Sequence, residues 1–493
     1  MLHKDPRIRW VLYEAFSKES QMSDKLKDIG VKVEKPQGET VSLYAAQKKI
    51  YPRSAKGVFA NWRILFVIAT QLVYFGLPWL QWNGRQAVLF DLVSRKFYLF
   101  GLTIMPQDFV YLAALLMCSA FGLFTWTTIA GRLWCGYSCP QTVYTEIMLW
   151  IEEKIEGDRN KRIKLDKEPW SLRKLRIKGT SHGIMILFSL WTGFTLVGYF
   201  TPMHDLLQAM PTFNYGTWET FWMFFYAGFT YLLAAHMREQ VCMYMCPYAR
   251  FQSAMFDEDT LIISYDEKRG EPRGARKKGQ EQANLGDCIN CGICVQVCPT
   301  GIDIRNGLQY ECIGCAACID ACDEVMVKIG SPKGLIRYTT EAALEGKYPE
   351  SAIASRLKRP RVIMYMLVLS VIFIAAIASL TMRKPFKVDI IRDRASLVRE
   401  TNDGLLENTY SIRIMNVSEQ VQTFRIKVEG LEGIKLVSER PEIRVEGMSN
   451  ELVSVRAQVA PEIATKGSHE IHFTVESLTN QASVEEKSSF IGE

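Results

Sequence analysis

The sequence predicts a polytopic α-helical membrane protein with an inserted cysteine-rich domain and an all-β domain at its C-terminus. Three observations support this fold class: about five apolar segments of membrane-spanning length, eight regularly spaced cysteines, and a final stretch that alternates apolar and polar residues. The 493 residues are too many for one compact domain. Basic residues gather beside the apolar segments, which favours membrane topology over a nucleic-acid partner.

Five segments approach the roughly 20 apolar residues that cross a bilayer. The predicted spans are Trp62–Leu80, Phe109–Ala130, Gly183–Phe200, Trp218–His236 and Val362–Met382. A sixth apolar stretch, AVLFDLVSRKFYLFGLTIM, is interrupted by Asp91, Arg95 and Lys96. Because these charges oppose burial in lipid, we expect this stretch to form a loop at the membrane surface.

Lysine and arginine set the predicted orientation. The first 61 residues are rich in both, and the loop Glu152–Lys178 holds ten basic residues, whereas Thr201–Thr217 holds none. Cytoplasmic loops carry the excess of basic residues, so the N-terminus and the 152–178 loop are predicted to be cytoplasmic. Basic residues flank the fifth span on both sides, and helix parity then places the C-terminus outside.

The chain therefore divides into five predicted regions. They are a cytoplasmic N-terminal region (1–61), a four-span region (62–248), a cytoplasmic cysteine-rich domain (249–360), a fifth span (361–382) and an outer β domain (383–493). In the last region, runs such as TYSIRIMNV and HEIHFTVES alternate apolar and polar residues with period two, between turns rich in Gly, Asn and Pro. This pattern predicts an antiparallel β-sandwich.

Eight cysteines form two runs with the same spacing, C-x-x-C-x-x-C-x-x-x-C. The runs are Cys288, Cys291, Cys294 and Cys298, then Cys312, Cys315, Cys318 and Cys322. Such a run wraps three corners of a [4Fe–4S] cube, and in two-cluster ferredoxins its fourth cysteine ligates the other cube. We expect one cluster on Cys288, Cys291, Cys294 and Cys322, and the other on Cys312, Cys315, Cys318 and Cys298.

Zinc is the alternative ligand for these cysteines, because paired C-x-x-C motifs also bind zinc. A zinc site takes four ligands, and two copies of a longer run would be unusual for it. The segment from about Asn284 to Val327 resembles a bacterial two-cluster ferredoxin domain, which is an α+β fold. It departs from that pattern at Asp323, where a proline would follow the last cysteine.

A different pattern, Cys-x-Tyr-x-Cys-Pro, occurs at the ends of two predicted spans. CGYSCPQ contains Cys135 and Cys139, and CMYMCPYA contains Cys242 and Cys246. The proline after each second cysteine disfavours helical geometry at that cysteine. We expect the pairs to converge into one soft-metal site at the cytoplasmic membrane edge, where thiolates suit copper(I) or zinc. Packing residues, or a disulfide despite the cytoplasmic position, are the alternatives.

Two histidines, His182 and His236, lie near the cytoplasmic ends of predicted spans. A histidine at that depth can ligate a metal, bind a quinone headgroup, or reach the interface without a partner. Metal ligation by these two residues is therefore one of several interpretations.

The combined motifs resemble a known family. RLWCGYSCPQTVYTE, VCMYMCPYARFQS, the double cysteine run, the apolar helices and the β-sandwich look like the cytochrome c oxidase accessory proteins of the CcoG/FixG/RdxA type. The resemblance covers nearly the whole chain from about Met22. It implies a multi-pass protein of the bacterial inner membrane with a periplasmic immunoglobulin-like domain. It also implies that Cys135, Cys139, Cys242 and Cys246 act in reducing Cu(II) to Cu(I) for assembly of cbb-type cytochrome oxidase.

Three functions follow as hypotheses. The first is a cupric reductase with two [4Fe–4S] clusters, copper ions as substrate, and oxidase assembly factors or a copper transporter as partners. The second is a quinol or quinone oxidoreductase subunit, and the third is a non-catalytic assembly scaffold. The electron donor is unassigned, because the chain contains no G-x-G-x-x-G nucleotide fingerprint.

Overall fold

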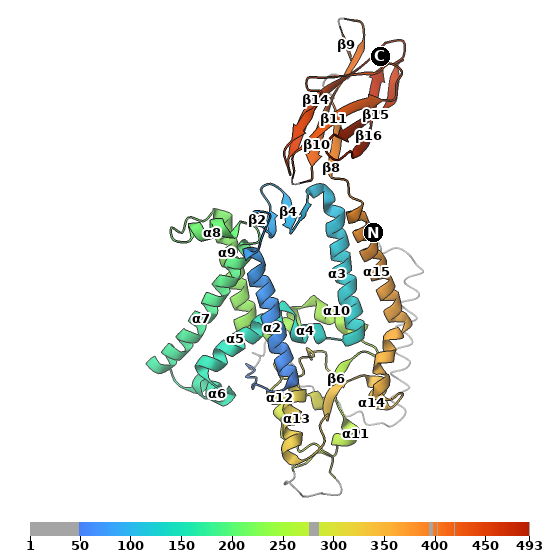
Figure 1. Ribbon diagram of the computed structural model, residues 1–493. Helices are drawn as coiled ribbons and strands as arrows, with labels where there is room; N and C mark the ends of the chain where they lie inside the picture. Colours follow the sequence, from blue (N-terminus) through green and yellow to red (C-terminus); the bar gives the residue numbers. More distant parts are fainter. Residues whose placement is uncertain (1–48, 276–284, 394–397, 402, 419, 493) are drawn as a thin grey trace, which may run out of the picture. The chain divides into compact units, whose positions relative to one another are not determined.

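The computed structural model describes residues 49–275, 285–393, 398–401, 403–418 and 420–492. Most of the predicted N-terminal region, residues 1–48, lies outside the described part. In the described residues the predicted fold class is confirmed: long apolar helices, a cysteine-rich domain and a C-terminal β-sandwich follow one another along the chain (Figure 1).

Four helices of the described residues are long and apolar enough to cross a membrane. They are α2 (Val58–Gly76, extended by a 3-10 turn to Trp79), α3 (Phe109–Ala130), α7 (Leu172–Val197) and α15 (Pro360–Thr381). α3 has the predicted bounds, whereas α7 begins eleven residues before the predicted span. Its first turns are basic but still helical. They begin after Ser171, whose hydroxyl accepts a hydrogen bond from the Lys174 N–H and so caps the helix.

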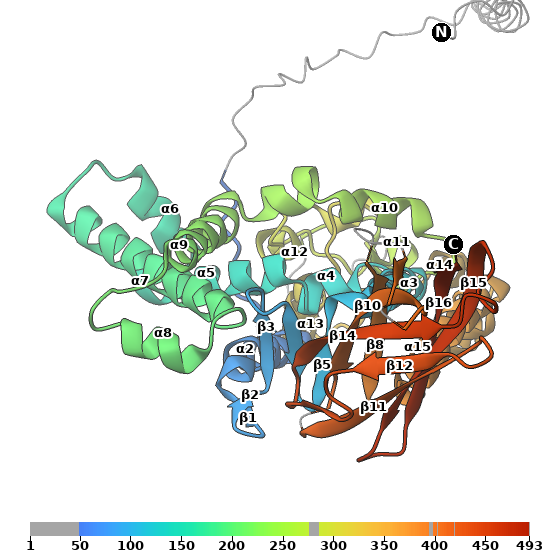
Figure 2. The ribbon, with the colours of Figure 1, turned by 90° about the horizontal axis from the view of Figure 1, so that it is seen from above.

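The predicted fourth span, Trp218–His236, differs in form from the other four. It begins as α9 (Thr217–Thr230) and continues as a π-helical segment (Tyr231–Met237) that ends at Arg238, whose φ is +48°. The α-helical part has 14 residues, so this segment is not among the four long helices. Figures 1 and 2 show α9 running beside α7, and α7 in turn contacts α5 (Pro140–Glu156).

α3 and α15 form an antiparallel pair. Tyr111 Oη donates to Ser379 O at 3.2 Å near one end, and Arg359 Nη2 donates to Thr128 O at 3.0 Å near the other. Each helix has 22 residues and is therefore about 33 Å long, close to the roughly 30 Å hydrocarbon core of a bilayer. The pair is thus long enough to separate two aqueous compartments.

The two ends of this pair carry different domains. At one end, the Leu261 N–H of the cysteine-rich domain donates to Ile129 O at 3.1 Å. At the other, Lys387 in the first sandwich strand forms an ion pair with buried Asp108 at 2.5 Å. The cysteine-rich domain and the sandwich therefore lie at opposite ends of the pair, as the predicted topology requires. Which end faces the cytoplasm stays a prediction.

The stretch predicted as a surface loop is a small antiparallel sheet. Its strands are β3 (Val88–Asp91), β4 (Lys96–Leu99) and β5 (Leu102–Ile104). The β3–β4 turn is closed by the Asp91 carboxylate, which accepts from the Ser94 N–H at 2.9 Å and from Ser94 Oγ at 2.6 Å. The segment does not span the membrane, as predicted, but it has regular structure.

The cysteine-rich domain is built on one strand pair and two short helices. β6 (Ile262–Tyr265) pairs antiparallel with β7 (Ile336–Thr339), and α12 (Ile293–Gln296) and α13 (Ala317–Ile329) each begin beside a cysteine. Ile263, Ile304 and Met326 are buried among the cysteines of the two runs. This core holds the two runs against each other.

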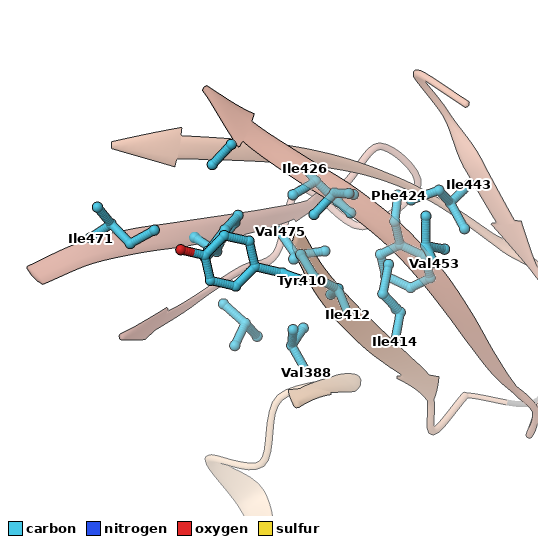
Figure 3. Packing of buried hydrophobic residues seen from close by; sticks show 14 of the residues in the cluster. Val388, Tyr410, Ile412, Ile414, Phe424, Ile426, Ile443, Val453, Ile471 and Val475 are labelled. Atoms are coloured by element: carbon cyan, nitrogen blue, oxygen red, sulfur yellow. The ribbon is translucent and has the colours of Figure 1, made fainter. Parts of the chain in front are cut away.

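The C-terminal domain is the predicted β-sandwich. One sheet has the order β12-β14-β10-β8 with β9 beside β10, and the other has the order β13-β11-β15-β16. The strands are β8 (Phe386–Arg392), β9 (Arg399–Glu400), β10 (Leu406–Asn416), β11 (Gln422–Glu429), β12 (Lys435–Ser438), β13 (Ile443–Val445), β14 (Asn450–Val459), β15 (Gly467–Ser477) and β16 (Ser483–Gly492). Alternate residues of facing strands, including Tyr410, Phe424 and Val475, meet in its core (Figure 3).

Candidate functional site

The eight cysteines of the two runs line two cavities in the cysteine-rich domain. The first cavity is lined by Cys294, Cys298, Cys312, Cys315 and Cys318. The second is lined by Cys288, Cys291, Cys294 and Cys322. The fourth cysteine of each run therefore lies with the first three of the other run, which is the exchange expected for two cubes in one domain.

The backbone of each run follows the same path around its cavity. Asn290 and Gly292 in the first run have φ of +53° and +64°, and Gly314 and Ala316 at the equivalent places in the second run have +70° and +58°. Alternating left- and right-handed residues turn successive N–H groups toward one point, and such nests accept anions and iron–sulfur groups. The donor atoms and the backbone of both cavities therefore fit [4Fe–4S] clusters.

The environment of these thiols is dry. Burial raises the pKa of the Cys294 thiol to about 11 and that of the Cys312 and Cys322 thiols to about 12. A buried thiol becomes a thiolate when a metal centre replaces its proton. Within the described residues, no three His, Cys, Asp or Glu side chains converge on one metal ion.

The two Cys-x-Tyr-x-Cys-Pro motifs have the same backbone geometry at their second cysteine. Cys139 stands at the N-cap position of α5 and Cys246 at that of α10 (Pro247–Met255), each in extended conformation with a proline as the first helical residue. Proline fits that position because it needs no amide hydrogen and its φ is already helical. Each motif therefore contains a sharp corner at its second cysteine, as the prolines indicate.

The four cysteines of these motifs lie near enough to interact electrostatically, but in the described part of the chain no three of them converge on one metal ion. Cys135 lies in α4 (Leu133–Tyr137) and Cys242 in a π-helical segment (Val241–Met245). Burial raises the pKa of the Cys242 thiol to about 12, and the thiols of the other three cysteines add to that rise. We call these four cysteines the membrane-edge tetrad.

The membrane-edge tetrad packs directly on the second cysteine run. A Cβ atom on Gly136 would lie 2.8 Å from both Cα and N of Cys315, so only glycine allows this approach of the two backbones. Cys135 and Cys315 are buried in one apolar cluster, against which Cys242 and Cys318 also pack. Tyr338 links the second cysteine run to the first motif. Its hydroxyl donates to Gly314 O at 2.7 Å and lies 3.4 Å from the Tyr137 hydroxyl.

Four buried charges around the two motifs were not predicted. Arg132 donates to Tyr310 O, and its positive charge lowers the pKa of the nearby Cys242 and Cys312 thiols, against the larger effect of burial. Glu152 is buried between Arg162, at 3.2 Å, and Arg238, the residue that ends the π-helical segment before Cys242. The sequence does contain a signal, because Arg132 stands three residues before the first motif and Arg238 four residues before the second. Basic residues at the cytoplasmic end of a membrane helix are common for reasons of topology, so this signal does not point to the site by itself.

The histidines lie apart from the cysteine groups. His182 Nδ1 is 2.9 Å from the Tyr231 hydroxyl, across α7 and the π-helical segment. His236 is exposed. In the described part of the chain neither belongs to a group that could hold a metal ion.

Three family models match the chain. Residues 112–164 match a model described as a 4Fe-4S binding domain, and residues 237–341 match a 4Fe-4S dicluster domain. Residues 376–493 match the IG-like fold at the C-terminus of FixG. The first two matches include the membrane-edge tetrad as well as the eight cysteines of the runs.

Curated relatives match over most of the chain. Protein RdxB of Cereibacter sphaeroides is 40% identical over 88% of this chain and 92% of its own length. Nitrogen fixation protein FixG of Rhizobium meliloti is 38% identical over 79% and 80%, and protein RdxA of Cereibacter sphaeroides is 40% identical over 80% and 85%. With its apolar helices and iron–sulfur domains, the chain belongs to the FixG/RdxA/RdxB family of membrane iron–sulfur proteins.

Proposed function

We propose that this protein is a cupric reductase, which binds Cu(II) at the membrane-edge tetrad and releases Cu(I). The observation that carries the proposal is the backbone contact between Gly136 and Cys315, which joins the tetrad to the second cysteine run. An oxidoreductase is also the class named in the description of the C-terminal family model.

The proposal assigns a role to each cysteine group. One cluster would be held by Cys288, Cys291, Cys294 and Cys322, and the other by Cys298, Cys312, Cys315 and Cys318. When bound, these [4Fe–4S] clusters would supply the single electron that converts Cu(II) to Cu(I), at potentials that this cluster type can reach. Copper is the substrate, and the tetrad is its binding site.

The residues of the chain favour the reduced ion. Thiolates select Cu(I) among the biological copper states, so binding at the tetrad drives the reduction. The positive charge of Arg132 offsets the negative charge that accumulates when several thiolates bind one monovalent ion. Burial of Cys135 keeps water away from one side of the ion.

The cellular role in the proposal rests on the family resemblance. Cu(I) from the tetrad would serve assembly of the copper centre of cbb-type cytochrome c oxidase. The partners would be oxidase assembly factors or a copper transporter, and the tetrad would face the cytoplasm with the sandwich in the periplasm.

The test is a single-turnover copper assay on the full chain in detergent. The clusters are reduced anaerobically, excess reductant is removed, Cu(II) is added, and Cu(I) is read with a chelator that absorbs only as its Cu(I) complex. We expect Cu(I) in proportion to reduced cluster, and loss of it when all four tetrad cysteines are changed to alanine. Cys118→Ala, in α3, is the matched control and should behave as wild type.

The cluster EPR spectrum separates two reasons for a loss. It should remain in the fourfold variant, since the tetrad cysteines are not the proposed cluster ligands. Normal copper reduction by that variant would overturn the proposal.

The quinol hypothesis has one supporting observation, the His182–Tyr231 hydrogen bond among the apolar helices. Such a polar pair is the chemistry that holds a quinone headgroup. Reduction of the clusters by added quinol, lost in Tyr231→Phe and without copper reduction, would favour this second function.

A further inference from the structure

A cavity of about 440 Å³ lies at the end of α3 that is remote from the cysteines. It is lined by the β3–β4 turn, by the residues just before α3, and by β10 and the β13–β14 turn of the sandwich. The lining residues are Ser94, Arg95, Lys96, Met105, Pro106, Arg413, Met415, Met448, Ser449 and Asn450. None of these belongs to the cysteine sites.

The lining is cationic. Three of the ten lining residues are basic and none is acidic. Neither Arg95 nor Arg413 has an ion-pair partner among the described residues. Their charges therefore face the cavity or solvent without a fixed counterion, which favours an anionic ligand.

The carboxylates around the cavity are already engaged or do not reach it. Asp108 is paired with both Arg383 and Lys387 at 2.5 Å. Asp91 accepts the hydrogen bonds of its own turn. Asp389 lies opposite Arg413 in the strand register but forms no ion pair with it.

The cavity wall is preformed. Lys96 Nζ donates to Met448 O at 2.5 Å, which joins the β3–β4 turn to the sandwich. Met448 has φ of +56°, and its turn is held by buried Asn416, whose side-chain amide donates to Val445 O at 3.2 Å and to Glu446 O at 3.1 Å. A left-handed methionine persists only where its surroundings enforce it.

An apolar tip stands beside the basic residues. Leu92 and Val93, in the same turn as Arg95, are 61% and 97% exposed. Phe109, the first residue of α3, is 68% exposed. Exposed apolar side chains next to arginine and lysine are typical of segments that lie in the headgroup layer of a membrane.

We propose that this cavity binds the phosphate headgroup of an anionic phospholipid, with Arg95 and Arg413 as its charged partners and Leu92 and Val93 among the acyl chains. Free phosphate offers the same charge to the arginines, but it leaves the apolar tip without a role. The bound lipid would fix the sandwich to the membrane next to the start of α3. This site is independent of the proposed copper chemistry.

The test uses the full chain in nanodiscs of equal phosphatidylglycerol and phosphatidylcholine, with retained lipid counted by native mass spectrometry. We expect phosphatidylglycerol to be retained preferentially. Arg95→Gln and Arg413→Gln should each lower its retention about fivefold, the effect of one basic residue at an anionic surface. Arg425→Gln, an exposed arginine on the other sheet of the sandwich, is the matched control and should change nothing.

Three outcomes would overturn the proposal: no preference over phosphatidylcholine, equal retention in the Arg95 and Arg413 variants, or displacement of the lipid by millimolar inorganic phosphate. Val93→Ser separates lipid from free anion, since it should weaken phospholipid retention without affecting binding of inorganic phosphate. If Arg413→Gln fails to fold, Arg95→Gln carries the test, because Arg95 lies in an exposed turn.

Discussion

The two kinds of cysteine motif gather their sulfurs by different means. In the long runs, left-handed residues such as Gly292 and Ala316 curl one loop around its own cavity. In the membrane-edge tetrad, prolines make two corners, and each corner supplies only half of the group. The runs are therefore largely local structures, whereas the tetrad exists only when distant helices pack correctly.

Because of this difference, the two sites should be sensitive to substitutions at different positions. A run depends on backbone positions between its cysteines, so changes that do not contact that backbone should spare it. The tetrad depends on contacts outside its motifs, notably the buried charges around Arg238 and the glycine contact at Gly136. A substitution at the buried charges should therefore separate the two sites experimentally, whereas one at Gly136, which contacts the Cys315 backbone, should affect both.

The largest effect is expected from Glu152→Gln. This change leaves Arg162 and Arg238 buried without their shared carboxylate, which costs about 3–5 kcal/mol. The thermal unfolding midpoint in detergent should fall. Copper binding should fall with it, because Arg238 lies four residues before Cys242 and fixes the start of the segment that carries this cysteine. Glu153→Gln, the next residue of α5, is the control. Equal loss of iron and copper would show that the two sites are not separable in this way.

Gly136→Ala should damage the junction between the sites. Its methyl group would press on the Cys315 backbone at 2.8 Å, a strain of about 1–3 kcal/mol. We expect lower iron content and slower copper reduction together, measured on the same preparation. Gly122→Ala adds a methyl group to α3 in open space and should be neutral or stabilising. Indistinguishable behaviour of the two variants would refute a tight contact at Gly136.

A smaller effect is expected from Asp320→Ala. The Asp320 carboxylate, between two cysteines of the second run, accepts from the Ala60 N–H at 2.7 Å and so caps α2 from another domain. Loss of a helix cap costs about 1 kcal/mol. The unfolding midpoint should drop slightly while iron content is kept. Glu324→Ala removes an exposed ion pair with Lys328 and should have less effect than Asp320→Ala, and the reverse order would contradict the capping role.

Much of the fold followed from the sequence. α3 has its predicted bounds because an unbroken apolar segment ends at Gly131, whose φ of +53° suits glycine. The sandwich followed from period-two alternation. The β3–β5 sheet did not, because every residue of β4 is half-buried and the alternation is hidden. The π-helical segment Tyr231–Met237 was also missed, since its apolar sequence reads like ordinary helix.

The candidate site was predictable to a similar degree. Cysteine spacing indicated which residues line each cavity, because three of the four ligands of a cluster are separated by only two residues each. The roles of Arg132 and Glu152 could not be read from the sequence. Their partners, Tyr310 and Arg238, are distant along the chain, and only tertiary packing shows that each of the two charges is buried against its partner.

Copper X-ray absorption on the Cu(I)-loaded protein is the most direct test of the tetrad as the copper site. We predict that sulfur atoms dominate the first coordination shell of the wild-type protein. In the fourfold Cys135, Cys139, Cys242 and Cys246 alanine variant, that sulfur shell should disappear while the iron spectrum stays the same. A sulfur shell unchanged in the variant, or a wild-type shell of nitrogen and oxygen alone, would contradict the account.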